Sequence, residues 1–190
     1  IRELADGSSG LDLASDIGPG LAKAAVAVLV NGIQKDLSDP IDQDSEVSII
    51  TIDSDEGLEI MRHTLTAQVL ARAVKNLYPD TKLAIGPTIA DGFYYDFEFK
   101  KAISPDDLAS IEKEMKKIIS NSSSITKTLH SKSDAMNIFK GMNESYKESI
   151  ISESEQDDNF QLYYQDNNEF VDLCRGPHLP SLKHIGAFGL

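Results

Sequence analysis

The chain is poor in cysteine: Cys174 is the only one among its 190 residues. A single cysteine allows no disulfide within the chain, which is typical of a protein from a reducing compartment. Long apolar runs are missing too, because no stretch approaches the roughly 20 residues that span a bilayer, and no secretory signal is visible. These absences predict a cytoplasmic protein with no membrane partner.

Positive charge is also scarce. The 18 lysine and arginine residues are outnumbered by 31 aspartate and glutamate residues, and the formal net charge is −13. This argues against a free-standing nucleic-acid binder, which needs a basic surface for phosphates. A module that contacts only the end of a nucleic acid, while another domain holds the rest, is still allowed. The sequence contains no internal repeat and neither a Walker nor a G-x-G-x-x-G loop.

The length and the 41% hydrophobic content fit one large domain or two small ones. The polar segment 53–57 is the predicted boundary, between a first domain over residues 1–54 and a second over residues 55–190. Asn31-Gly32 is a strong hairpin signal in the first domain. The elements predicted around it are a helix at Leu11–Ile17 and strands at Ala24–Val30, Ile33–Leu37 and Glu46–Ile52.

This order of elements, with G-L-A-K-A-A-V-A-V-L-V-N-G at Gly20–Gly32, resembles the TGS domain, a small ubiquitin-like β-grasp module. On that resemblance Ile1–Leu4 is the second strand. The chain starts at Ile1 rather than at a methionine, and we expect the first strand upstream of it. Nothing in this domain is typical of a catalytic site.

The second domain is predicted to be a larger α+β unit with an antiparallel sheet and a long helix. An apolar stripe over Leu58–Tyr78 predicts a helix of about six turns. Ser104-Pro105 is expected to supply the cap and first position of another helix. Paired strands are predicted at Phe160–Tyr164 and Phe170–Leu173, and a further strand at Ser149–Ile151.

The segment Val171–Pro180, V-D-L-C-R-G-P-H-L-P, combines Cys174 with His178. Pro177 lies between them and blocks a helix, and the glycine before it favours a turned or extended backbone. We therefore expect a tight loop that presents a thiol and an imidazole to one pocket. The alternative is a buried structural cysteine beside a surface histidine, since free cysteine is commonly a small core residue.

Four stretches together resemble the N-terminal half of bacterial-type threonyl-tRNA synthetases. They are M-R-H-T-L-T-A-Q-V-L-A-R-A-V at Met61–Val74, A-I-G-P-T-I-A-D-G-F-Y-Y-D at Ala84–Asp96, E-S-Y-K at Glu144–Lys147 and V-D-L-C-R-G-P-H at Val171–His178. The resemblance implies a TGS domain followed by an editing domain related to that of alanyl-tRNA synthetase. It also implies that the aminoacylation core lies after Leu190. That core would bind ATP, magnesium and zinc and would form the homodimer. No cofactor is expected in this part.

The implied activity answers a discrimination problem. Serine lacks one methyl group of threonine, so a threonine pocket rejects it by only about 1–3 kcal/mol, roughly 10–200-fold. A second site that hydrolyses mischarged seryl-tRNA(Thr) supplies the rest and refuses the methyl group of threonine. The implied partner is the acceptor end of tRNA(Thr), with serine as the esterified amino acid. Hydrolysis needs a positioned water, a proton acceptor and donors for the oxyanion, and histidine suits the proton transfer.

The resemblance also implies the site residues. The expected catalytic residues are His63, Lys147, Asp172, Cys174 and His178, and the expected substrate-binding residues are Thr64, Gln68, Gly86, Tyr95 and Tyr163. His178 and Lys147 are expected to activate water or stabilise charge, and Cys174 and Asp172 to orient substrate or water.

The long helix departs from the family pattern, in which two histidines four residues apart line the site. The second position falls on Gln68, and the first falls on Thr64 by spacing or on His63 by the context M-R-H. Because His63 and Gln68 are five residues apart, they differ by about 140° on a regular helix. Either the helix starts loosely near His63, or a one-residue π-bulge lies between the two. Glutamine cannot act as a general base, so weakened editing is expected.

Two other functions stay open. His63, Cys174 and His178 could form a three-ligand zinc site of a metal-dependent hydrolase, although Gln68 removes a good ligand. Alternatively, the pocket is degenerate and the chain is a non-catalytic module that binds the tRNA acceptor end.

Overall fold

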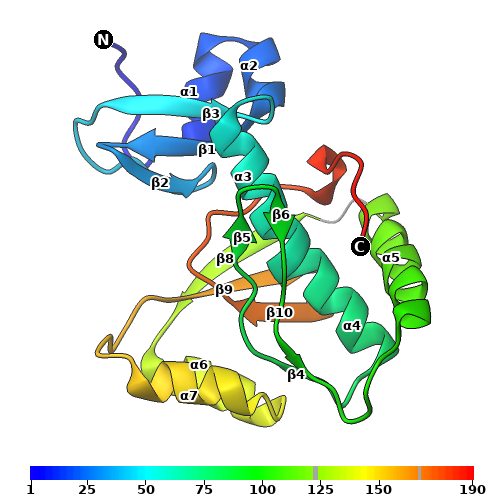
Figure 1. The fold of residues 1–190 in the computed structure, drawn as a ribbon. Coiled ribbons are helices and arrows are strands. Elements are labelled where there is room, and N and C mark those ends of the chain that lie inside the picture. The colour runs from blue at the N-terminus through cyan, green and yellow to red at the C-terminus, as the bar shows by residue number, and fades with distance from the viewer. Residues whose placement is uncertain (122–123, 167) are drawn as a thin grey trace.

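The computed structural model describes residues 1–121, 124–166 and 168–190 (Figure 1). Its helical elements are α1 (Gly10–Ile17), α2 (Pro19–Ala24), α3 (Asp55–Thr64), the π-helix η1 (Leu65–Leu70), α4 (Ala71–Leu77), α5 (Pro105–Ser120), α6 (Lys132–Gly141), α7 (Ser145–Glu153) and the 3-10 turn η2 (Leu182–His184). Its strands are β1 (Ala25–Val30), β2 (Ile33–Asp36), β3 (Val47–Thr51), β4 (Lys82–Leu83), β5 (Thr88–Ile89), β6 (Gly92–Phe93), β7 (Phe97–Glu98), β8 (Ile125–His130), β9 (Phe160–Gln165) and β10 (Phe170–Leu173). The predicted α+β class is confirmed.

The first domain is an antiparallel sheet of order β2-β1-β3, with α1 and α2 on one face (Figure 1). Asn31 and Gly32 close the β1–β2 hairpin with φ of 49° and 82°, as the predicted two-residue turn requires. Ala14 of α1 packs in one cluster with Val28 of β1. The other face of the sheet, with Val26, is turned toward α3.

Two predicted strands are wrong. Ile1–Leu4 is exposed and forms no strand. Ser149–Ile151 lies inside α7, where Ile151 is buried against the second sheet. An alternation of three or four residues is too short to separate a strand from a helix, so packing decides between them.

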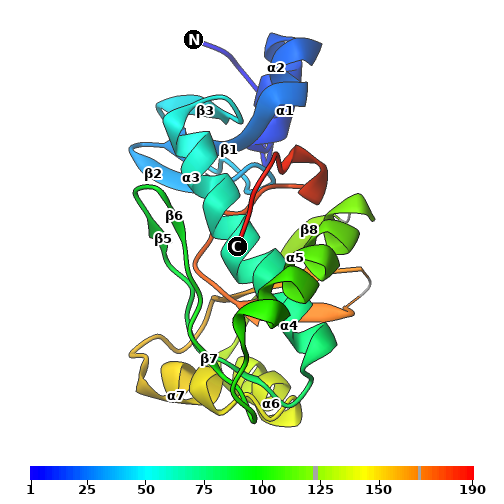
Figure 2. The ribbon, with the colours of Figure 1, turned by 45° about the vertical axis from the view of Figure 1, so that its right-hand side comes forward.

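One long helical run crosses the molecule, formed by α3, η1 and α4 in sequence (Figure 2). It begins at Asp55, where the Ser54 hydroxyl accepts the Gly57 N–H at 3.0 Å, so the predicted loose start near His63 is wrong. The predicted π-bulge is confirmed: η1 is π-helical, and the Ala71 N–H bonds to the carbonyl five residues earlier. The extra residue is absorbed without a break in the helix.

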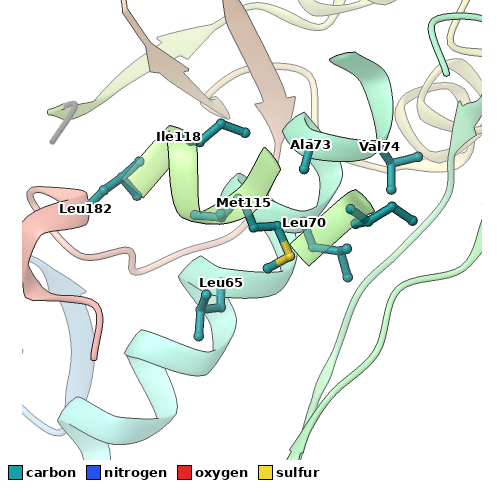
Figure 3. Packing of buried hydrophobic residues seen from close by; sticks show 9 residues of the cluster. Leu65, Leu70, Ala73, Val74, Met115, Ile118 and Leu182 are labelled. Carbon is teal, nitrogen blue, oxygen red and sulfur yellow. The ribbon is translucent and has the colours of Figure 1, made fainter. Parts of the chain in front are cut away.

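Helix α5 packs along the C-terminal half of this run (Figure 3). Ser104 and Asp107 form a capping box at its start, with Pro105 in the first position, as predicted from the sequence. The core between the two helices consists of Leu65, Val69, Leu70, Ala73, Val74, Ile111, Met115, Ile118 and Leu182. This packing makes the long helix a rigid support for the site.

The second domain has an antiparallel sheet of order β10-β9-β8, with α6 and α7 packed against it (Figure 1). The short hairpin β5–β6 runs beside α3 in both views (Figure 2). The long helix, the hairpin, α7 and strand β10 therefore surround one region. No helix in the described residues is long and apolar enough to cross a membrane.

Candidate active site

A cleft of about 770 Å³ opens where these elements meet. Residues of the long helix, the segment from Ile85 to Tyr95, α7, β9 and the end of β10 line it. Of the predicted site residues, the lining contains His63, Gly86, Tyr95, Lys147, Asp172 and Cys174. The other four, Thr64, Gln68, Tyr163 and His178, are buried behind the wall and do not line the cleft.

Cys174 pairs with His63 across the cleft. The Cys174 Sγ lies 3.1 Å from His63 Nε2, and His63 Nδ1 lies 3.3 Å from the Pro177 carbonyl oxygen. Because a carbonyl only accepts, these partners assign the proton to Nδ1, and Nε2 is left to accept from the thiol. The predicted loop does present the Cys174 thiol to the cleft. The imidazole of His178 is buried behind the wall, and the imidazole that contacts the thiol is that of His63.

Burial lowers the pKa of His63, an effect opposed by its bond to Pro177 and by the charge of Asp172. The ring is therefore neutral at pH 7. A neutral imidazole is a general base for water once the Cys174 thiol turns its hydrogen away from Nε2.

His178 is 2% exposed and is held from behind by Thr64. The Thr64 hydroxyl donates to the Ile60 carbonyl at 2.8 Å, so its oxygen accepts from His178 Nδ1 at 3.2 Å and from the Leu179 N–H at 3.0 Å. This assigns the His178 proton to Nδ1. The sequence predicts Thr64 as a substrate-binding residue, whereas in the structure its hydroxyl bonds His178 and Leu179 of the loop that follows β10.

The His178 ring lies between two other rings. Its centroid is 4.4 Å from that of His63 and 4.5 Å from that of Tyr163, which meets it edge-on. Its Nε2 is buried and, within the described residues, has no hydrogen-bond partner. His178 thus supports His63 from the protein interior.

Lys147 and Asp172, which also line the cleft, form a buried ion pair with Nζ and Oδ1 2.8 Å apart. The Leu173 N–H also donates to Asp172 Oδ1, at 2.8 Å, and the Tyr95 hydroxyl lies 3.5 Å from Oδ2. Burial raises the pKa of Asp172, and the charge of Lys147 opposes that effect. Burial also raises the pKa of Tyr95 far above its usual range, so its hydroxyl stays a donor.

Glu144 opens the E-S-Y-K stretch and positions Lys147, a role the sequence alone did not indicate. Its fully buried carboxylate binds Lys75 at 2.7 Å and accepts the Leu83 N–H at 2.9 Å. These bonds tie the start of α7 to α4 and β4, and Lys147 follows within the first turn of α7.

Gln68 departs most from its predicted place. It is fully buried, and its Oε1 accepts from Gln165 Nε2 at 2.9 Å. Ala67 takes the position on the cleft wall instead. The π-helical turn and the amide partner Gln165 together turn Gln68 into the core, and no sequence signal marked Gln165 as that partner.

Gly176 allows the loop to approach Tyr163. Its φ is +63°, and a Cβ there would lie 1.9 Å from the buried Tyr163 hydroxyl. Gly86 is similar, because a Cβ would lie 2.2 Å from the Tyr95 ring. Both glycines therefore allow a close approach that a side chain would block.

Gly176→Ala is expected to destabilise the protein by more than about 1–2 kcal/mol, the cost of the left-handed backbone alone, because Tyr163 must also move. Urea unfolding would measure this change. Gly186→Ala is the matched control: a Cβ there meets nothing within 4 Å, and a change within about 0.5 kcal/mol is expected. Equal effects of the two variants would contradict the tight fit at Gly176.

His63, Cys174 and His178 also bring potential metal ligands together, with all three ligand atoms within 4.8 Å of one another. Each histidine bonds an oxygen through Nδ1, which leaves its Nε2 as the ligand atom. A histidine that binds a metal usually makes such a bond through its other ring nitrogen. Two imidazoles and a thiol are donors that suit zinc.

Comparison with known proteins finds two family matches within the chain. Residues 1–51 match the TGS domain family, and residues 161–190 match the threonyl and alanyl tRNA synthetase second additional domain. The predicted boundary after residue 54 is not settled by these matches and stays a prediction.

Several threonine–tRNA ligases are similar over the whole chain. That of Acidithiobacillus ferrooxidans is 48% identical over 189 residues, which cover 100% of this chain and 29% of the relative. That of Prochlorococcus marinus is 48% identical over 179 residues, which cover 94% and 28%. That of Francisella philomiragia is 47% identical over 190 residues, which cover 100% and 29%. The chain thus spans less than a third of the length of these curated relatives. Because such enzymes align with it from end to end, the chain belongs to the threonyl-tRNA synthetase family, of which it represents the N-terminal TGS and editing region.

Proposed function

We propose that the cleft hydrolyses the ester between serine and the terminal adenosine of mischarged tRNA(Thr). The observation that carries this proposal is that the neutral His63 and the buried Lys147–Asp172 pair line the same cleft. Ester hydrolysis requires a base to take the proton of water and a positive charge or donor to stabilise the oxyanion.

In the proposed reaction, a water attacks the carbonyl carbon of the ester and its proton passes to His63 Nε2. Lys147 stabilises the oxyanion, the bond from the carbonyl carbon to the ribose oxygen breaks, and that oxygen takes the proton from His63. The products are serine and free tRNA, and no cofactor takes part. Cys174 and Asp172 orient water and substrate.

His178 has a different role in this proposal from the water activation expected from the sequence. Its side chain is buried, faces the His63 ring and does not line the cleft. We assign it to positioning His63. The helix wall also offers Ala67 instead of a second histidine, which supports the expectation of weakened editing.

The test is deacylation of seryl-tRNA(Thr) and threonyl-tRNA(Thr) by the purified chain. Seryl-tRNA is expected to be hydrolysed roughly 10–200-fold faster, the discrimination that one methyl group allows. A wild-type rate no higher than that of His178→Ala would overturn the proposal. Binding of a seryl-adenosine analogue without turnover would support a non-catalytic module that binds the acceptor end.

The relatives are named as ligases, and we propose that this region serves such an enzyme in the cytoplasm. Its partner is the acceptor end of tRNA(Thr). Aminoacylation, with ATP, magnesium and zinc, and homodimer formation belong to the part of the relatives that this chain does not cover.

A metal-dependent hydrolase is the second candidate, favoured by the cluster of His63, Cys174 and His178. Such a site would hold zinc through two imidazoles and a thiolate and would activate a bound water. Metal analysis of the purified chain separates the two mechanisms. One equivalent of zinc, with hydrolysis lost on chelation and restored by zinc, would favour the metal-dependent reaction.

A further inference from the structure

The first domain contributes a buried carboxylate to the back of the site. Asp36, the last residue of β2, is 7% exposed. Its Oδ1 accepts the backbone N–H of His178 at 2.9 Å, and its Oδ2 accepts the Tyr163 hydroxyl at 2.7 Å. Both partners lie in the second domain, more than 120 residues along the chain.

The charge of Asp36 is matched by Lys127 of β8, whose Nζ lies 2.8 Å from Oδ2. Burial by itself would lower the pKa of Lys127, but its bonds to Asp36 and Asp39 outweigh that effect and raise it. Lys127 is therefore protonated, and its charge strengthens the bonds that the Asp36 carboxylate accepts.

An apolar contact holds the same loop beside the carboxylate. Leu179, which follows His178, is fully buried with Val26, Ala27 and Ile50 of the first sheet and with Ile60 of α3. In both views the chain after β10 runs up beside α3 to the first domain (Figures 1 and 2). The loop is thus held between the long helix and the first domain.

We propose that Asp36 is a positioning residue of the hydrolytic site, through which the first domain sets the geometry of the Cys174–His178 loop. This inference rests on the proposed function. The carboxylate fixes the His178 backbone and the Tyr163 ring; Tyr163 packs on the His178 ring, and that ring packs on His63. Asp36 does not line the cleft, so it acts on turnover and leaves binding of the substrate unchanged.

Asp36→Ala in the whole chain is the direct test. Turnover of seryl-tRNA(Thr) is expected to fall about 10–100-fold, the effect of a small misplacement of reacting groups, while KM changes less than about threefold. The His178 amide, followed by NMR, is expected to lose its hydrogen-exchange protection. Asp36→Asn keeps an oxygen acceptor for that amide, so it is expected to recover both the protection and part of the turnover.

Asp39→Asn is the matched control, because Asp39 also pairs with Lys127, at 2.5 Å, and accepts the Asp36 N–H at 3.1 Å, but within the described residues it bonds neither His178 nor Tyr163. Its turnover is expected to stay within about twofold of wild type, because an asparagine oxygen still accepts the Asp36 N–H and the bonds of Asp36 to His178 and Tyr163 are kept. Unchanged turnover in a folded Asp36→Ala, or an equal loss in Asp39→Asn, would overturn the inference. If Asp36→Ala does not fold, Tyr163→Phe decides, since removing the hydroxyl is expected to lower turnover without raising KM. Absence of hydrolysis in the wild type would reject the proposed function, and the His178 amide would still report on the positioning.

Discussion

Lys147→Met is expected to destabilise the protein by about 3–5 kcal/mol and to abolish hydrolysis. The substitution removes the partner of Asp172, whose carboxylate is 1% exposed and 2.8 Å from Lys147 Nζ. A buried charge left without its partner carries this cost, whereas the intact pair itself adds little net stability. Urea unfolding and deacylation of seryl-tRNA(Thr) measure the two effects.

A double variant separates stability from catalysis. Lys147→Met with Asp172→Asn removes both charges, and the asparagine oxygen still accepts the Leu173 N–H that Asp172 now accepts at 2.8 Å. We expect it to recover most of the lost stability but none of the hydrolysis, because the positive charge at the cleft is gone. Lys117→Met is the control, because this lysine is exposed where it pairs with Glu114, and its loss should cost at most about 1 kcal/mol. Hydrolysis by the double variant at the wild-type rate would exclude Lys147 from the reaction.

His63→Gln is expected to lower hydrolysis by about 10²–10⁴-fold, the usual contribution of a positioned general base. Glutamine can still donate to the Pro177 carbonyl and accept from the Cys174 thiol, the two bonds that His63 makes, but it cannot take up the proton. His184→Gln is the control, because His184 lies in η2 and does not line the cleft. A fall of less than about tenfold in His63→Gln would assign the base elsewhere.

The pH profile gives the same variant a second readout. Because burial lowers the pKa of His63 below 6.5, the wild-type rate should hold at pH 6.5 and fall only as the pH drops through the lowered pKa. The free energy of unfolding should also fall as the pH drops. Below pH 6.5 unfolded His63 binds a proton before the folded residue does, so folding weakens as the pH falls toward the folded pKa. The change in rate should be absent in His63→Gln, and the change in stability should be smaller, because His184, whose pKa burial also lowers, still contributes.

Local signals predicted the elements that depend on a few neighbouring residues. Asn31-Gly32 has the positive φ values of a two-residue hairpin, and Ser104 with Pro105 starts α5. The five-residue spacing of His63 and Gln68 even indicated the π-helical turn. Weaker signals failed at Ser149–Ile151, where a short apolar pattern fits a helix as well as a strand.

The sequence by itself determined the α+β class, the family and six of the residues that line the cleft, because turn chemistry, caps and matching stretches lie in consecutive residues. Only the tertiary structure decided which side chains meet. It pairs Cys174 with His63 across 111 residues, turns Gln68 into the core against Gln165, and brings Asp36 to the back of the loop. Such choices depend on how separate elements pack and which buried polar groups find partners, and neither is encoded in the spacing of residues along one segment.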